Sequence, residues 1–142
     1  MPSGSFDFHI VDLDFSLDHQ PELSEWLYQV IASENFESGN LDFTFMSDED
    51  LLKINKEHLD HDFYTDIITF EYTEGKMISG DLLISLDRVK ENATKLSLNF
   101  SDELHRVMVH GVLHLCGYND KTEAEQVEMR SKEDYYLSLR SF

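Results

Sequence analysis

The sequence predicts an α+β domain, in which one small mixed sheet of about four strands is packed by about five helices. Segments with alternating apolar residues are interspersed with segments whose apolar residues recur at helical spacing. Two neighbouring β-rich runs are separated by a short segment containing Gly75, which indicates an antiparallel hairpin. Most of the helical patterns come after residue 87, so strands and helices do not alternate regularly.

The first half of the chain predicts two strands and two helices. Alternation of apolar and polar residues over 6–10 and 41–45 indicates two half-buried strands. Between them, Pro21 opens a segment whose apolar residues recur at the spacing of an amphipathic helix. Ser47, with Asp50 three residues later, has the position of an N-cap and predicts a short helix after the second strand.

The second half predicts the hairpin and three further helices. The β-rich runs cover 67–72 and 77–86, and a helical pattern begins at Asp87. Ser101 has the character of an N-cap for a helix that runs to about Cys116.

The last helix has a capping box. Thr122 is followed three residues later by Glu125, and the helical pattern continues through Leu137.

The composition is that of a single domain over residues 1–142. The single cysteine excludes an internal disulfide, and the first residues lack the basic segment and apolar run of a signal peptide. No stretch approaches the roughly twenty apolar residues of a membrane span. We therefore expect a cytoplasmic protein without a membrane segment.

The charge balance counts against a nucleic-acid partner without excluding one. The chain has 29 acidic and 11 basic residues, for a net charge of −18, whereas proteins that bind phosphate backbones usually have a basic face. A local groove, a bound cation or a helper protein can still supply positive potential. Basic residues before or beside the motif described next are Lys53, Lys56, Arg88, Lys90, Lys95 and Arg106, and the sequence leaves open whether they share a face.

The segment HGVLHLCGYND, residues 110–120, predicts a metal site. His110 and His114 are four residues apart and so lie on one face of a helix. Gly117 can stop the helix in a left-handed conformation, after which the chain can turn back and bring Asp120 to the same point. Three protein ligands with a fourth position open to water or substrate are typical of catalytic zinc. On spacing alone, one buried and one exposed histidine would be the commoner arrangement.

The spacing of this motif also matches a known protease pattern. Gly117 and Asp120 lie seven and ten residues after His110, as in the HExxHxxGxxH motif of metzincins. However, residue 111 is glycine where those enzymes have the glutamate that acts as general base. The sequence therefore disfavours peptide hydrolysis by that route.

The motif closely resembles the HGxLHLxGYDH signature of the YbeY family, metal-dependent endoribonucleases of bacterial ribosomal RNA maturation. INKEHLDHDFYTDIITFEY, residues 54–72, and SGDLLIS, residues 79–85, resemble further segments of that family in the same order. The resemblance implies a single-strand-specific metallo-endoribonuclease that acts in 3′-end maturation of small-subunit (16S) rRNA and in ribosome quality control. The implied partners are ribosomal RNA, the small ribosomal subunit and ribosome-associated helper proteins.

By this resemblance, His110, His114 and residue 120 would be the ligands of one divalent ion, with zinc expected. The family usually has histidine at the third position, where this chain has Asp120. A carboxylate makes manganese or iron more credible than three imidazoles would.

The chain departs from the family near the start of the predicted hairpin. Leu59 stands where family members commonly have an arginine that is thought to aid catalysis, and His58 or His61 could substitute or be an exposed loop pair. Thr65 and Asp66 match the family's TD and could hydrogen-bond a ligand histidine or orient water, or simply open a strand.

Two other potential ligands are expected to pack in the core or at the surface. Cys116 lies two residues after His114 and so faces away from it, and His105 is out of phase with His110. Two alternative functions stay open: a metal-dependent amide or ester hydrolase, and a non-catalytic ribosome assembly factor with a structural metal.

Overall fold

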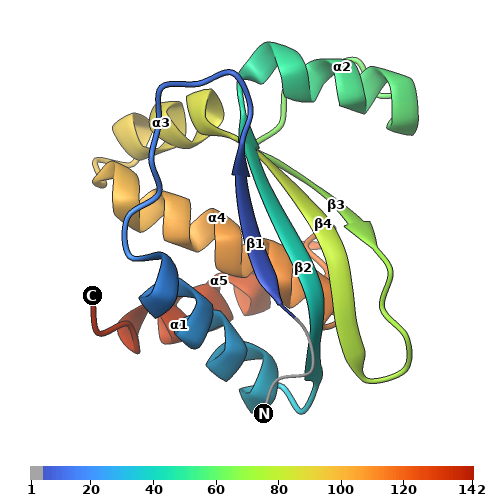
Figure 1. Ribbon diagram of the computed structural model, residues 1–142, viewed down its shortest axis with the longest axis vertical. Coiled ribbons are helices and arrows are strands. Elements are labelled where there is room, and N and C mark those ends of the chain that lie inside the picture. The colour runs from blue at the N-terminus through green and yellow to red at the C-terminus, as the bar shows by residue number, and fades with distance from the viewer. Residues whose placement is uncertain (1–4) are drawn as a thin grey trace.

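The computed structural model describes residues 5–142 and confirms the α+β fold as a single domain (Figure 1). Within these residues it has four strands and five helices. In chain order they are β1 (Phe6–Ile10), α1 (Gln20–Ser33), β2 (Glu37–Met46), α2 (Asp48–Leu59), β3 (Ile67–Glu71), β4 (Met77–Ser85), α3 (Leu86–Lys95), α4 (Phe100–Leu115) and α5 (Glu123–Ser138).

The four strands form one mixed sheet in the order β1-β2-β4-β3. β2 pairs in parallel with both β1 and β4, whereas β3 and β4 form the expected antiparallel hairpin. The second strand is longer than its alternation predicted, because it begins at Glu37 and has an irregular register between Ser38 and Leu41. The sheet therefore ends on one side in β3, which leads directly from the segment containing Asp66.

Helix α4 lies at the centre of the helical layer on one face of the sheet (Figure 1). It contacts β3 and β4 and is surrounded by α1, α3 and α5, and its apolar side joins the main hydrophobic core. Helix α2 belongs to a second, smaller core, in which Leu51 packs with Met46 and Ile68. Among the described residues, no helix is both long and apolar enough to cross a bilayer.

Two predicted helix caps are confirmed and one is wrong. The Ser47 side chain accepts a hydrogen bond from the Asp50 N–H, and Thr122 forms the complete capping box. The helix predicted to begin after Ser101 instead begins at Phe100, with Asn99 as its N-cap. Asparagine and serine cap helices equally well, so the local sequence could not decide between them. The Phe100 ring packs edge-on against Phe15, which favours the earlier start.

His105, which was expected either to pack in the interior or to lie at the surface, is buried. The residue is 6% exposed, its ring contacts those of Trp26 and Phe142, and the Arg140 Nη1 donates a hydrogen bond to its Nδ1 at 2.6 Å. Burial and the Arg140 charge lower the pKa of His105 to about 4. The native protein therefore keeps this histidine neutral at a pH where the unfolded chain, with a histidine pKa of about 6.5, has already bound a proton.

This difference predicts a pH-dependent free energy of unfolding. Because the pKa of His105 is lowered in the folded state, the contribution of the neutral ring to the free energy of unfolding is complete above about pH 6.5 and is lost as the pH falls towards 4. The upper limit of this contribution is about 3 kcal/mol. The variant His105→Gln cannot titrate, so its free energy of unfolding should fall less over this pH range in urea titrations. Parallel curves for the variant and the unmodified protein would show that His105 does not contribute.

Candidate metal centre

Helix α4 places His110 and His114 on one face, one turn apart, as their spacing predicted. Their Nε2 atoms are 3.0 Å apart, and the Asp120 Oδ2 lies 3.3 Å from the Nε2 of His110 and 3.4 Å from that of His114. All three side chains are partly exposed. Two imidazole nitrogens and one carboxylate oxygen thus converge on one point at the protein surface.

The turn that brings Asp120 back begins at Gly117. This glycine has a φ of 104°, a conformation that side chains with a Cβ rarely adopt. The N–H of Gly117 bonds to the carbonyl oxygen of His114, and the N–H of Tyr118 bonds to that of Leu113. This pair of hydrogen bonds is a Schellman motif, which ends α4 and reverses the chain. The predicted role of the glycine is confirmed.

The other ring nitrogen of each histidine is held by an acceptor. The His110 Nδ1 lies 2.6 Å from the Glu133 Oε2, and the His114 Nδ1 lies 2.9 Å from the carbonyl oxygen of Tyr118. Because a carboxylate and a carbonyl can only accept, each Nδ1 donates its proton outward. In the neutral rings, both Nε2 lone pairs therefore face each other and the Asp120 carboxylate.

Converging lone pairs repel unless a cation lies between them. Burial opposes protonation of His110, but the hydrogen bond and charge of Glu133, with the charges of Asp120 and Asp66, raise the pKa of His110 overall. The site thus attracts positive charge, which either a proton or a metal ion can supply.

The three side chains fit a metal ion. Their ligand atoms all lie within 4.8 Å of one another. Zinc bound to nitrogen or oxygen at about 2.0–2.1 Å in tetrahedral geometry separates its ligands by about 3.3 Å, close to the spacing of these atoms. Outward donation from both Nδ1 atoms also fixes the ring orientation, as is usual for histidines that bind metals. His110, His114 and Asp120 could therefore hold one ion, with a further coordination position left open.

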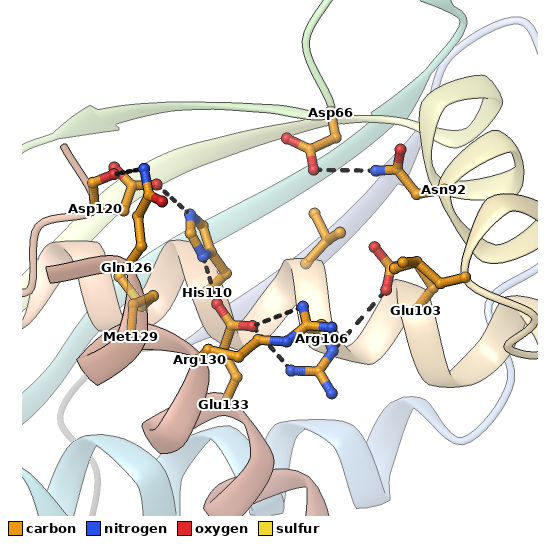
Figure 2. A pocket seen from close by; sticks show the side chains of 12 residues that line it. Asp66, Asn92, Glu103, Arg106, His110, Asp120, Gln126, Met129, Arg130 and Glu133 are labelled. Atoms are coloured by element: carbon orange, nitrogen blue, oxygen red, sulfur yellow. Dashed lines mark hydrogen bonds and ion pairs between the residues drawn. The ribbon is translucent and has the colours of Figure 1, made fainter. Parts of the chain in front are cut away.

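A cavity of about 330 Å³ adjoins this group (Figure 2). Helix α5 forms one wall, and the wall opposite is formed by α3, α4 and the residue before β3. The lining residues with polar side chains are Asp66, Asn92, Glu103, Arg106, His110, Asp120, Gln126, Arg130 and Glu133. The cavity is large enough for part of a nucleotide beside the metal group.

Of the residues predicted near the start of the hairpin, Asp66 lines this cavity, whereas Thr65 and Leu59 do not. Asp66 accepts a hydrogen bond from the Asn92 amide at 3.4 Å, and burial raises the pKa of Asp66 against the opposing charge of His110. The direct partners of the two histidines are Glu133 and the Tyr118 carbonyl, neither of which was recognised from the sequence.

The other potential ligands lie outside the metal group. Cys116 packs against the main core, and burial raises the pKa of its thiol to about 12, so it is not a thiolate at neutral pH. His61 stacks on Phe63, and His58 lies edge-on to Phe70. Among the described residues, only His110, His114 and Asp120 form a group of metal-binding side chains.

Gly111 allows α4 to pack closely against the sheet. A Cβ atom at this position would lie 2.6 Å from the Leu82 Cδ2 and 2.7 Å from the Ile67 Cδ1. These distances are too short for a nonbonded contact, so any side chain must displace its neighbours. A glutamate here would also bury its carboxylate among apolar atoms. The packing thus gives a physical reason why this motif lacks the general base of the HExxH enzymes.

This packing predicts a graded loss of stability. We expect Gly111→Ala to lower the free energy of unfolding by about 1 kcal/mol and Gly111→Val by about 3 kcal/mol, because overpacking costs grow with the volume inserted. Denaturant titrations measure both values. Equal stability of the valine variant and the unmodified protein would contradict the close contact.

The chain is similar to known proteins over most of its length. Residues 11–140 match the family model described as Endoribonuclease YbeY. A protein named Endoribonuclease YbeY from Cytophaga hutchinsonii is 49% identical over 143 residues and is covered completely, as is this chain. Its namesake from Flavobacterium johnsoniae is 47% identical over 90% of this chain and 92% of its own length.

A solved structure also shares the fold. The solution structure of a Thermotoga maritima protein superposes with a TM-score of 0.65 at 23% identity, and the match covers 94% of this chain and 87% of that one. At this identity, the likeness concerns the fold alone. The extent of the family match and the full-length relatives lead to one conclusion: the chain belongs to the YbeY endoribonuclease family.

Proposed function

We propose that this endoribonuclease is metal-dependent and specific for single-stranded RNA, and that its ion is bound by His110, His114 and Asp120. The observation that carries the proposal is the convergence of two imidazole Nε2 atoms and one carboxylate oxygen. The hydrogen bonds of the two Nδ1 atoms turn the lone pairs of both rings inward. Zinc is the proposed ion, since it accepts this ligand set and an open fourth position.

Each residue of the site has a definite part in this proposal. His110, His114 and Asp120 would hold the ion, which would supply Lewis acidity towards a water molecule or a scissile phosphate. Glu133 and the Tyr118 carbonyl hold the two histidines in orientation. Asp66, in the wall of the cavity, could orient water or a ribose hydroxyl, and Thr65 precedes it in the segment just before β3.

The proposed substrate is the precursor of small-subunit ribosomal RNA. We infer that the chain trims the 3′ end of 16S rRNA and acts in ribosome quality control, in the cytoplasm and on the small subunit, with help from ribosome-associated proteins. The net charge of −18 supports a requirement for helpers or local cations at the RNA. The names of the full-length relatives support RNA as the substrate class.

Cleavage assays with the purified protein test the proposed metal dependence and substrate class. The zinc-loaded chain should cleave single-stranded RNA internally, cleave duplex RNA much more slowly, and leave peptide and ester substrates intact. Removal of the metal by a chelator should stop cleavage, and added zinc should restore it. Cleavage of peptides but not RNA would favour the hydrolase alternative.

A cell experiment distinguishes the enzyme from a non-catalytic assembly factor. Cells that lack the protein should accumulate 16S precursors extended at the 3′ end, and the unmodified gene should correct this defect. We expect a folded Asp120→Ala variant not to correct it. Full correction by a variant that neither binds metal nor cleaves RNA would support the assembly role instead.

A further inference from the structure

Two arginines line the cavity beside the metal group, and they differ in exposure and in how closely carboxylates pair with them. Arg106 is only 14% exposed at its side chain, and its guanidinium donates to Glu133 at 3.0 Å and to Asp134 at 2.7 Å. Arg130, on α5, is 51% exposed, and its nearest acidic atom is the Glu133 Oε1 at 3.9 Å. That oxygen already accepts the hydrogen bond from Arg106, so Arg130 is only weakly neutralised.

Of the nine other lysines and arginines of the described chain, five have a carboxylate partner. Arg88 pairs with Asp48 and Glu91, and Arg140 pairs with Asp102. Lys56, Lys95 and Lys132 also have carboxylate partners. The other four, Lys53, Lys76, Lys90 and Lys121, are not among the residues that line the cavity. Arg130 is therefore the weakly paired cation of the cavity, and it offers a local attraction for an anion in a chain with a net charge of −18.

The carboxylates that line the cavity restrict where an anion could bind. Asp66 and Glu103 line the inner wall of the cavity and disfavour a phosphate deep inside it. Figure 2 shows Arg130 and Glu133 together on the α5 side, with the Glu133 carboxylate directed towards His110. The Arg130 guanidinium is thus separated from the metal group by the Glu133 carboxylate and the His110 ring. An anion on Arg130 would therefore lie on the far side of Glu133 from the metal group, which suits a phosphate that flanks the scissile one.

We propose that Arg130 binds a backbone phosphate of the RNA next to the scissile phosphate and so positions the strand across the metal group. The inference rests on the proposed function. Arginine suits this role because its planar fork can donate two hydrogen bonds to one phosphate. The contact is independent of base identity, so it supplies affinity and register, and sequence preference must come from elsewhere.

Binding and kinetics test the proposal on the zinc-loaded, full-length protein. A short, fluorescein-labelled 2′-O-methyl RNA keeps the phosphates and blocks attack by the ribose hydroxyl, and gel electrophoresis checks that it stays intact. Fluorescence anisotropy gives its Kd at several salt concentrations. We expect Arg130→Ala to raise the Kd about tenfold and to lower the slope of log K against log salt by about 0.7, the value for one phosphate contact on a single strand. With cleavable RNA, KM should rise by a similar factor and kcat should change little.

Two further variants separate this role from a structural one. Arg130→Lys keeps the charge, so it should keep the salt slope and recover part of the affinity. Lys76→Ala removes a cation in the turn between β3 and β4, outside the cavity, and should leave both Kd and slope unchanged.

The outcomes distinguish this inference from the proposed function. If the unmodified protein cleaves RNA but Arg130→Ala binds it with the same Kd and salt slope, the inference is wrong and the proposed function stands. If the unmodified protein neither binds nor cleaves RNA, both are wrong.

Discussion

Replacing His114 with alanine is expected to abolish metal binding and RNA cleavage together while the protein stays folded. Loss of a ligand should weaken zinc binding by more than the roughly 10–100-fold that loss of an outer hydrogen-bond partner costs. The fold should survive because His114 is partly exposed, at the end of a helix whose apolar side is intact. Zinc per chain after gel filtration, cleavage rate and circular dichroism measure the three effects.

An unrelated histidine provides the control for this experiment. His9 lies on β1, where it faces Asp42 at 3.4 Å and belongs to no metal-binding group. His9→Ala should retain one zinc ion per chain and full activity. One tightly bound zinc ion in the His114→Ala variant would contradict the assignment, since the remaining His110 and Asp120 provide too few ligands for a stable site.

The second large effect is expected on replacing Glu133 of α5. Its carboxylate contacts both His110 and Arg106 of α4, so it supports the metal group and the contact between the two helices. This carboxylate is 4% exposed and accepts hydrogen bonds from His110 and Arg106 through different oxygens. In Glu133→Gln, an amide N–H facing His110 would force that ring to place its proton on Nε2, the atom that faces the ion. We therefore expect zinc affinity to fall about 10–100-fold, measured by competition with a chromophoric chelator.

Truncation of the same residue tests its structural part. In Glu133→Ala, Arg106 keeps Asp134 but loses its buried partner, so we expect the free energy of unfolding of the metal-free protein to fall by about 3 kcal/mol. The control is Glu128→Gln, which changes an exposed residue of the same helix. Zinc affinity in Glu133→Gln equal to that of the Glu128 variant would show that the hydrogen bond to His110 does not support the site.

Sequence reasoning was most successful where the chemistry is local. His110, His114, Gly117 and Asp120 lie within eleven residues, and the helical repeat and a left-handed turn are sufficient to bring their functional groups together. The same holds for the capping box at Thr122, whose two hydrogen bonds form within one helical turn.

Features that depend on packing between distant segments could not be predicted in the same way. Glu133 is one of several acidic residues on α5, and it is distinguished only by the face that this helix turns towards α4. Arg130 lines the cavity for the same reason, although it was not among the basic residues noted around the motif. The N-cap of α4 at Asn99 instead of Ser101 also depends on a tertiary contact, that of Phe100 with Phe15.

The central claim is that one ion is shared by two imidazoles and one carboxylate, with a coordination position left free. A crystal structure of the purified protein, with diffraction data collected on both sides of the zinc absorption edge, tests this claim most directly. We predict one anomalous peak per chain, about 2.0–2.2 Å from the Nε2 atoms of His110 and His114 and from an oxygen of Asp120, with no fourth protein ligand. An ion closed off by a fourth side chain, or no ion between these three groups, would contradict the account.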